Sequence, residues 1–246
     1  MTDAREIYRL HAQQYDALVS REDHAGNLLA AIRDRVQLEG AEVVELGAGT
    51  GRITALLAPH VRSLRAFDLE PAMLEVARQK LSELQARNWQ LEVADNASLP
   101  VTESSADLSV AGWSYGHQTV WHPGSWREPI AAAIAEMKRV LRPGGTALVI
   151  ETLGTGHSEP FTPPTELARY YALLSEELQF ERTWIRTDYQ FASPSEGERL
   201  VRFFFGAELA EAYLAAGGAR LPECTGLWWW RKPATGPVDC QSPGRS

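Results

Sequence analysis

The segment 43-VVELGAGTGRIT-54 places three glycines directly after a short apolar run. Val43, Val44 and Leu46 are residue types that fill a strand buried inside a sheet. Glycine allows the chain to turn sharply and lets a ligand approach main-chain N–H groups closely. The segment therefore predicts a buried strand, a ligand-binding turn and the start of a helix.

The spacing of the glycines separates two classes of ligand. Gly47, Gly49 and Gly51 form the pattern G-x-G-x-G, whereas a dinucleotide fingerprint starting at Gly47 requires glycine or alanine at position 52. Arg52 stands there, so an NAD(P)-dependent oxidoreductase is the less favoured alternative. Asp68 follows Gly47 by about 20 residues, at the end of the next predicted strand, where a carboxylate accepts both ribose hydroxyls of a nucleoside.

Strand-like and helix-like runs alternate along the chain around this turn. Strands are predicted at 43–46, 64–67, 89–93, 106–111 and 146–151, and helices at 53–57, 71–84 and 126–141. This alternation predicts an α/β fold with a Rossmann-like, doubly wound and mostly parallel sheet, covered by helices on both faces. Later strands at 185–191 and 221–231, around a helix near 195–216, predict a closing antiparallel strand.

The segments outside this alternation predict a single domain over residues 1–232 with two additions. Residues 1–38 read as two N-terminal helices with a break near 22–26. Glycines and prolines crowd the stretch before a helix at 165–180, so about 154–180 is predicted to be a helical lid insert. Residues 233–246 offer nothing to pack and are predicted to form a disordered tail.

Charge and composition narrow the partners. The chain has 24 Lys plus Arg against 32 Asp plus Glu, a net charge of -8, which disfavours nucleic acid. Its 2 cysteines are too few for a disulfide framework or a four-cysteine zinc site, and no metal is expected. It lacks an apolar run of roughly 20 residues and a signal-peptide core, so a cytoplasmic protein without a membrane partner is expected. The oligomeric state stays open.

Four segments in this order resemble the class I S-adenosylmethionine-dependent methyltransferases: VVELGAGTGR, FDLEPAMLEVAR, EVADNASLP and MKRVLRPGGTALVIE. The likeness runs from about residue 7 to 152. It implies the cofactor S-adenosyl-L-methionine, with S-adenosyl-L-homocysteine as product. It also implies methyl transfer to an oxygen or nitrogen atom of a small molecule or natural-product precursor. A non-catalytic S-adenosylmethionine-binding module is the other alternative.

The resemblance also implies a set of cofactor-binding residues. Glu45, Gly47, Ala48, Gly49 and Gly51 would lie beside the methionyl part, and Asp68 would hold the ribose. Leu69 and Met73 would flank the adenine, while Asp95 would accept its amino group, with Asn96 and Ala97 nearby. Tyr15 resembles the tyrosine that caps the cofactor pocket in this family. For Met73 and Tyr15, a role in the core is the alternative.

The loop 111-AGWSYGHQTVWH-122 follows the fourth strand, at the edge of the sheet where open α/β folds bind ligands. Gly112 and Trp113 are expected beside the cofactor, and Tyr115 and His117 are the candidate catalytic residues. His117 is a candidate general base, titrating near the ordinary histidine pKa of about 6.5. A structural histidine is the alternative. The loop lacks both cysteine and the Pro-Pro-Tyr motif of nucleobase-amine methyltransferases, so a small-molecule acceptor is favoured.

Overall fold

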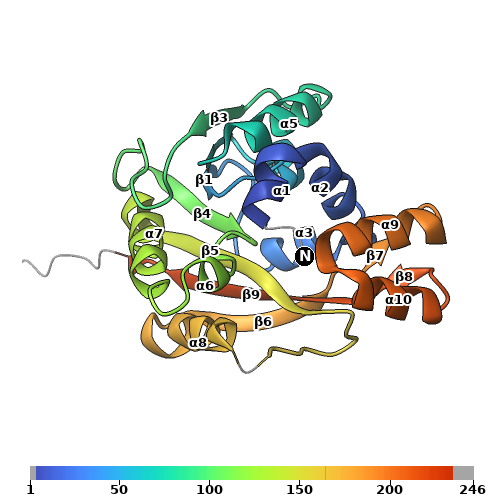
Figure 1. The fold of residues 1–246 in the computed structure, drawn as a ribbon. Helices are drawn as coiled ribbons and strands as arrows, with labels where there is room; N and C mark the ends of the chain where they lie inside the picture. Colours follow the sequence, from blue (N-terminus) through green and yellow to red (C-terminus); the bar gives the residue numbers. More distant parts are fainter. Residues whose placement is uncertain (1–3, 164, 235–246) are drawn as a thin grey trace, which may run out of the picture.

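The computed structural model describes residues 4–163 and 165–234. In this part of the chain a seven-stranded sheet has the order β3-β2-β1-β4-β5-β9-β6 (Figure 1). Its strands are β1 (Glu42–Leu46), β2 (Ser63–Asp68), β3 (Trp89–Val93), β4 (Ala106–Gly112), β5 (Leu141–Thr155), β6 (Glu181–Arg186) and β9 (Glu223–Arg231). Strands β1 to β5 pair in parallel, and β9 is antiparallel to both β5 and β6. The predicted mostly parallel sheet with a closing antiparallel strand is confirmed.

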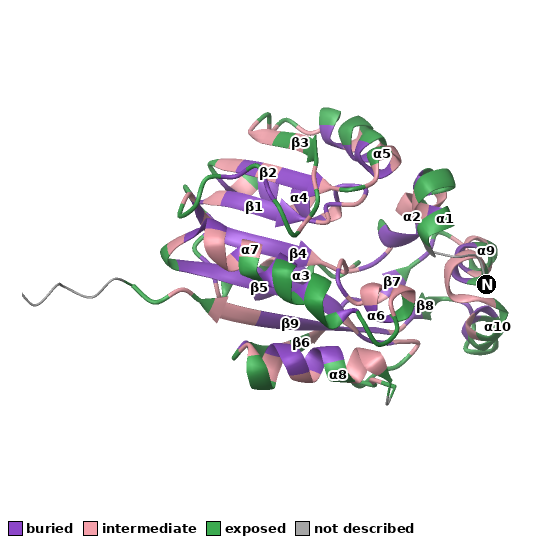
Figure 2. Cartoon of the chain, turned by 60° about the vertical axis from the view of Figure 1, so that its left-hand side comes forward, coloured by how far each residue is buried: buried purple, intermediate pink, exposed green. Residues whose placement is uncertain are grey.

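Helices cover both faces of the sheet, and Figure 2 shows the buried strands between them. One face packs against α3 (Asn27–Arg33), α4 (Arg52–Leu57) and α5 (Pro71–Ser82). The other face packs against α7 (Arg127–Val140) and α8 (Glu166–Ala172). In α7, Ile130, Ala133, Ile134 and Met137 recur at helical spacing and are all buried, so the apolar stripe explains how this helix docks.

The N-terminal region holds three helices in place of the two predicted. The chain bends at His11, which has φ -130° and ψ 30°, so α1 (Ala4–Leu10) ends before α2 (Ala12–Val19) begins. At this bend the His11 ring packs edge-on against Phe203, with ring centroids 5.9 Å apart. Helix α3 follows after the predicted break. Both α1 and α2 contact α5, which places them at the edge of the sheet where the parallel strands end.

The helical part of the predicted lid belongs to the core, which corrects that prediction. Tyr170 and Leu174 are completely buried, and Tyr171 stacks on Trp228 of β9 with ring centroids 4.7 Å apart. The prolines and glycines before this helix suggested an insert outside the sheet layers. Long apolar side chains on the helix pack against the sheet instead, so the helix forms part of the layer that covers the sheet. The predicted tail, 233–246, lies outside the described residues from 235 onward.

A small cap follows β6. The single predicted helix near 195–216 is two helices, α9 (Pro194–Phe205) and α10 (Ala207–Ala215), because Gly206 breaks the helix with φ +100°. They pack with the short strands β7 (Tyr189–Gln190) and β8 (Arg220–Leu221) and with Leu18 of α2. Within the described ranges, none of the helices is both long and apolar enough to cross a bilayer.

Candidate active site

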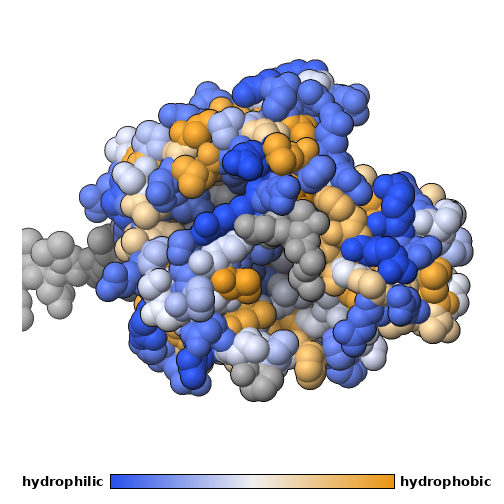
Figure 3. Space-filling view, in the orientation of Figure 1, coloured by the Kyte–Doolittle hydropathy of each residue, from blue (hydrophilic) through white to orange (hydrophobic). Residues whose placement is uncertain are grey.

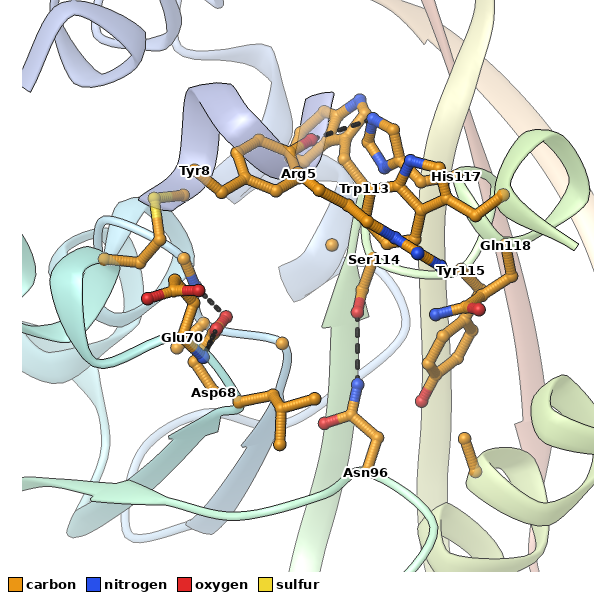
Figure 4. Close-up of a pocket in the computed structure, with 18 of the residues that line it drawn as sticks. Arg5, Tyr8, Asp68, Glu70, Asn96, Trp113, Ser114, Tyr115, His117 and Gln118 are labelled. Atoms are coloured by element: carbon orange, nitrogen blue, oxygen red, sulfur yellow. Dashed lines mark hydrogen bonds between the residues drawn. The ribbon is translucent and has the colours of Figure 1, made fainter. Parts of the chain in front are cut away.

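A cleft of about 860 Å³ opens where β1, β2 and β4 end (Figure 4). It brings together nearly all of the residues predicted from the sequence: Tyr15, Glu45, Gly47, Ala48, Gly49, Asp68, Leu69, Met73, Asp95, Asn96, Ala97, Gly112, Trp113, Tyr115 and His117. Gly51 does not line the cleft. A Cβ there would lie 3.0 Å from Cβ of Ala77, so this glycine allows α4 to pack closely on α5.

Asp68 lies at the end of β2 and fixes the glycine turn. Its Oδ2 accepts a hydrogen bond from the backbone N–H of Gly49, and its Oδ1 accepts one from Glu70, each at 2.8 Å. Burial raises the pKa of Asp68, while these two backbone N–H groups lower it. Each carboxylate oxygen retains a lone pair, so the group is able to accept further hydrogen bonds from a diol.

The turn after β1 has room only for glycine at its first position. Gly47 has φ +68°, and a Cβ there would lie 2.0 Å from Oγ of Ser114. Gly49 has φ +55°, and a Cβ there would lie 3.4 Å from Cε of Met73, which is 4% exposed. The backbone of this turn therefore forms the floor of the cleft.

Glu45 is buried at the end of β1, directly before this turn. Its Oε2 accepts a hydrogen bond of 2.6 Å from Oγ1 of Thr54. Burial raises the pKa of Glu45 to about 8. The carboxyl group is therefore mainly protonated at pH 7 and offers an O–H donor to a neighbour.

The side of the cleft assigned to adenine is more open. Leu69 is 68% exposed, and Asp95 and Ala97 are exposed, with Oδ1 of Asp95 accepting from the N–H of Ala97 at 2.8 Å. Asn96 donates from Nδ2 to Oγ of Ser114 at 3.2 Å, whereas its buried Oδ1 has no partner. An apolar side chain beside unused acceptors is the arrangement that an amino-bearing base requires.

The loop after β4 turns sharply against β5. Trp113 has φ +51°, and its N–H donates to the carbonyl of Ile150 at 2.7 Å. The guanidinium of Arg52 lies 3.8 Å from the centroid of the Trp113 ring. A Cβ at Gly112 would lie 3.0 Å from Cγ1 of Ile53, so the strand end packs tightly on α4. Tyr115 is buried, its hydroxyl has no partner, and burial raises its pKa.

His117 is held from two sides. Its Nε2 lies 2.9 Å from the hydroxyl of Tyr8 (Figure 4). Its ring stacks on Trp121 with centroids 5.5 Å apart. Desolvation lowers the pKa of His117 to about 4, which corrects the expected titration near 6.5. The imidazole is thus neutral throughout the physiological range. Tyr15 packs edge-on against Tyr8 at 5.2 Å.

A second cavity of about 410 Å³, which we call the chamber, lies beyond the cleft. The two share a wall made of Tyr15, Val19, Arg52, Trp113 and His117. Figure 3 shows hydrophobic residues at the surface near α6 (Gln118–Trp121).

Sequence reasoning missed the charged residues of the chamber. Glu22, Arg52, Glu151 and Glu223 line it, and Glu22 forms an ion pair of 2.7 Å with Arg52. Glu151 follows the apolar run of β5 much as Glu45 follows that of β1. This shared pattern could have identified Glu151 as a candidate site residue. Burial raises the pKa of Glu151 to about 7.

The part of the chain that contains the glycine turn matches a known family. Residues 43–145 match the family model described as Methyltransferase domain. The chain is 29% identical over 217 residues to the malonyl-[acyl-carrier protein] O-methyltransferase of Hahella chejuensis, covering 86% of this chain and 62% of that protein. It spans less than two thirds of the length of several other curated relatives.

Solved structures share the fold. The YcgJ protein of Bacillus subtilis superimposes with a TM-score of 0.58 at 16% identity, covering 85% of this chain and 99% of that one. Phosphoethanolamine N-methyltransferase 2 of Haemonchus contortus, solved with S-adenosyl-L-methionine, gives a TM-score of 0.57 at 16% identity, covering 95% of this chain and 60% of that one. At these identities the likeness establishes the fold.

The domain match over residues 43–145, the motifs and the sheet order support the predicted class I S-adenosylmethionine-dependent methyltransferase. The cleft fits the cofactor of that class: Asp68 offers free lone pairs for a ribose, Asn96 has an orphaned buried oxygen, and the backbone of the glycine turn lines the cleft.

Proposed function

We propose that this chain transfers a methyl group from S-adenosylmethionine to an oxygen or nitrogen atom of a small molecule, leaving S-adenosylhomocysteine. The observation that carries the proposal is the pairing of the cleft with the chamber, because the two cavities share five lining residues. A chamber of this size suits a small ligand and not a protein or nucleic acid strand. The acidic composition also disfavours nucleic acid.

The cleft would bind the cofactor, and the chamber would bind the methyl acceptor. Asp68 would hold the ribose, the glycine turn would lie beside the methionyl group, and Asn96 would face the adenine. When bound, the cofactor supplies an electrophilic methyl group on a sulfonium with a good neutral leaving group. Tyr15 and Trp113 would exclude water and align the acceptor, since orientation supplies much of the rate in an in-line displacement.

An acceptor that carries a proton must lose it. His117 is neutral at pH 7, but its Nε2 is engaged by Tyr8. Glu151 has a pKa raised to about 7, which suits a group that takes up and releases protons near neutrality. The two are the candidate bases, and the effect of substituting each one separates them.

Turnover tests the proposal. Purified chain is incubated with S-adenosylmethionine and a panel of small amines, alcohols, phenols and carboxylic acids, and S-adenosylhomocysteine is quantified by mass spectrometry. We expect acceptor-dependent formation of S-adenosylhomocysteine that Asp68→Ala abolishes. Tight cofactor binding with no turnover on any acceptor or in a metabolite extract would instead indicate the non-catalytic module.

A further inference from the structure

Acidic side chains outnumber basic ones in the lining of the chamber. Four glutamates line it, Glu22, Glu151, Glu166 and Glu223, and Arg52 is the one guanidinium or ammonium group among the described lining residues. Arg52 is neutralised by Glu22 at 2.7 Å, and Glu166 pairs with Arg169. Glu151 and Glu223 therefore have no cationic side chain as partner in the lining, and an anionic ligand would find no unpaired cation there.

Glu223 presents an unused acceptor. The residue is 1% exposed, and its Oε1 accepts a hydrogen bond of 2.6 Å from Oγ1 of Thr152. Its Oε2 is buried and has no hydrogen-bond partner. Burial and the nearby charge of Glu22 raise the pKa of Glu223, whereas a cation bound beside it would favour the ionised form. A buried oxygen of this kind is costly unless a ligand supplies a donor.

Glu151 is held rigidly in the same chamber. One oxygen, Oε1, accepts the backbone N–H groups of Tyr115 and Gly116 at 3.0 Å and the hydroxyl of Tyr170 at 3.2 Å. This network ties the end of β5 to the loop after β4. The position of the Glu151 carboxyl group is therefore set by the fold and does not depend on a ligand.

Aromatic rings complete the lining. Tyr15, Trp113, Tyr189, Phe204 and Phe205 contribute rings, whose faces attract cations. Aliphatic side chains are mixed among them, including Val120, which is 77% exposed on α6. Rings and carboxyl groups together suit a cation attached to a hydrocarbon body.

We infer that the chamber binds an organic ammonium ion between Glu223 and Glu151, so that the methyl acceptor is an amine. This inference rests on the methyl-transfer function proposed above. An ammonium nitrogen has no lone pair, so one N–H proton passes to a carboxylate oxygen of the chamber. The electron pair of that N–H bond stays on nitrogen as the lone pair that accepts a methyl group. An anionic acceptor, such as a carboxylate, is disfavoured by the same charges.

Calorimetry on the full chain with saturating S-adenosylhomocysteine tests the inference with three probes of matched size. These are phenethylamine, 2-phenylethanol and 3-phenylpropanoate, which differ mainly in charge. We expect phenethylamine to bind about 10-fold or more tightly than the alcohol, and the carboxylate to show no binding. Glu223→Gln should weaken phenethylamine by about 10-fold and leave the alcohol unchanged. Glu181→Gln, at an exposed position of β6, is the matched control.

Val120 offers a test that does not depend on a buried substitution. Val120→Lys should weaken phenethylamine, and Val120→Glu should not, because only the lysine places a like charge at the chamber. Tighter binding of the carboxylate, equal binding of all three probes, or an unchanged amine affinity in folded Glu223→Gln would overturn the inference. Failure of S-adenosylhomocysteine to bind, with amine binding intact, would instead contradict the proposed methyl transfer and leave the ammonium site standing.

Discussion

Tyr8 of α1 and His117 of the loop after β4 are joined by a hydrogen bond, with Oη of Tyr8 2.9 Å from Nε2 of His117. The two residues are far apart in sequence, and their rings meet edge-on at 5.6 Å. Both line the cleft. The contact therefore closes the N-terminal helix over the cofactor side of the site, and the cofactor is expected to leave when this contact opens.

Tyr8→Phe removes the hydrogen bond and keeps the ring. One such bond contributes about 0.5 to 1.5 kcal/mol, so S-adenosylhomocysteine should bind about 2- to 10-fold more weakly. We expect the loss to arise from faster dissociation, measured by stopped-flow displacement. An unchanged dissociation rate would show that α1 does not retain the cofactor.

His117→Ala distinguishes two roles for the imidazole. As a general base, its loss should lower turnover by about 100-fold with little change in cofactor affinity. If the imidazole instead holds α1 in place through Tyr8, its loss should reproduce the faster cofactor dissociation of Tyr8→Phe. We expect the second result, because a pKa near 4 makes this imidazole a weak base. A large loss of turnover with wild-type dissociation would contradict this expectation.

Gly47→Ala should be more damaging than its backbone conformation alone explains. Gly47 and Gly124 both have positive φ, +68° and +82°, but only Gly47 has a neighbour within 4 Å of an added Cβ. Each alanine should cost about 1 to 2 kcal/mol from the left-handed backbone. The clash with Ser114 adds to this at Gly47. Chemical denaturation should therefore show a larger loss for Gly47→Ala than for Gly124→Ala, and equal losses would argue against the tight turn.

Buried carboxyl groups predict an unusual dependence of stability on pH. The pKa values of Glu45 and Glu151 are raised to about 8 and about 7, so the folded chain holds more protons than the unfolded chain above pH 4.5. The free energy of unfolding should therefore fall as pH rises from about 5 to 8, by up to about 1.4 kcal/mol per pH unit for each group.

Denaturation of the ligand-free chain at several pH values measures this slope. Glu45→Gln should flatten the profile, because the amide does not titrate. Glu136 and Glu196 have lowered pKa values, so their opposite effect lies below about pH 4.5, outside this window. The lowered pKa of His117 offsets part of the fall up to about pH 6.5, and the full slope is expected above that pH. A profile that is flat or rises between pH 5 and 8 would contradict the assignment.

Local patterns predicted the sheet, the glycine turn and Asp68, because strand, turn and carboxylate lie within one βαβ unit. The chamber depends on contacts that spacing does not encode. Glu151 and Glu223 come from β5 and β9, which become neighbours only when the late antiparallel strand joins the sheet. The lowered pKa of His117 depends on its burial, and α1, which holds it, is folded back from the start of the chain.

The most direct measurement is a calorimetric titration of the purified chain with S-adenosylhomocysteine and, separately, with NAD. We predict saturable binding of S-adenosylhomocysteine and none of NAD. We also predict that Asp68→Ala weakens S-adenosylhomocysteine by about 100-fold, or roughly 2 to 3 kcal/mol, because hydrogen bonds to a charged group are lost. Glu75→Ala, at an exposed position of α5, should bind like the wild type. Binding of NAD in preference, or wild-type affinity in Asp68→Ala, would contradict the account.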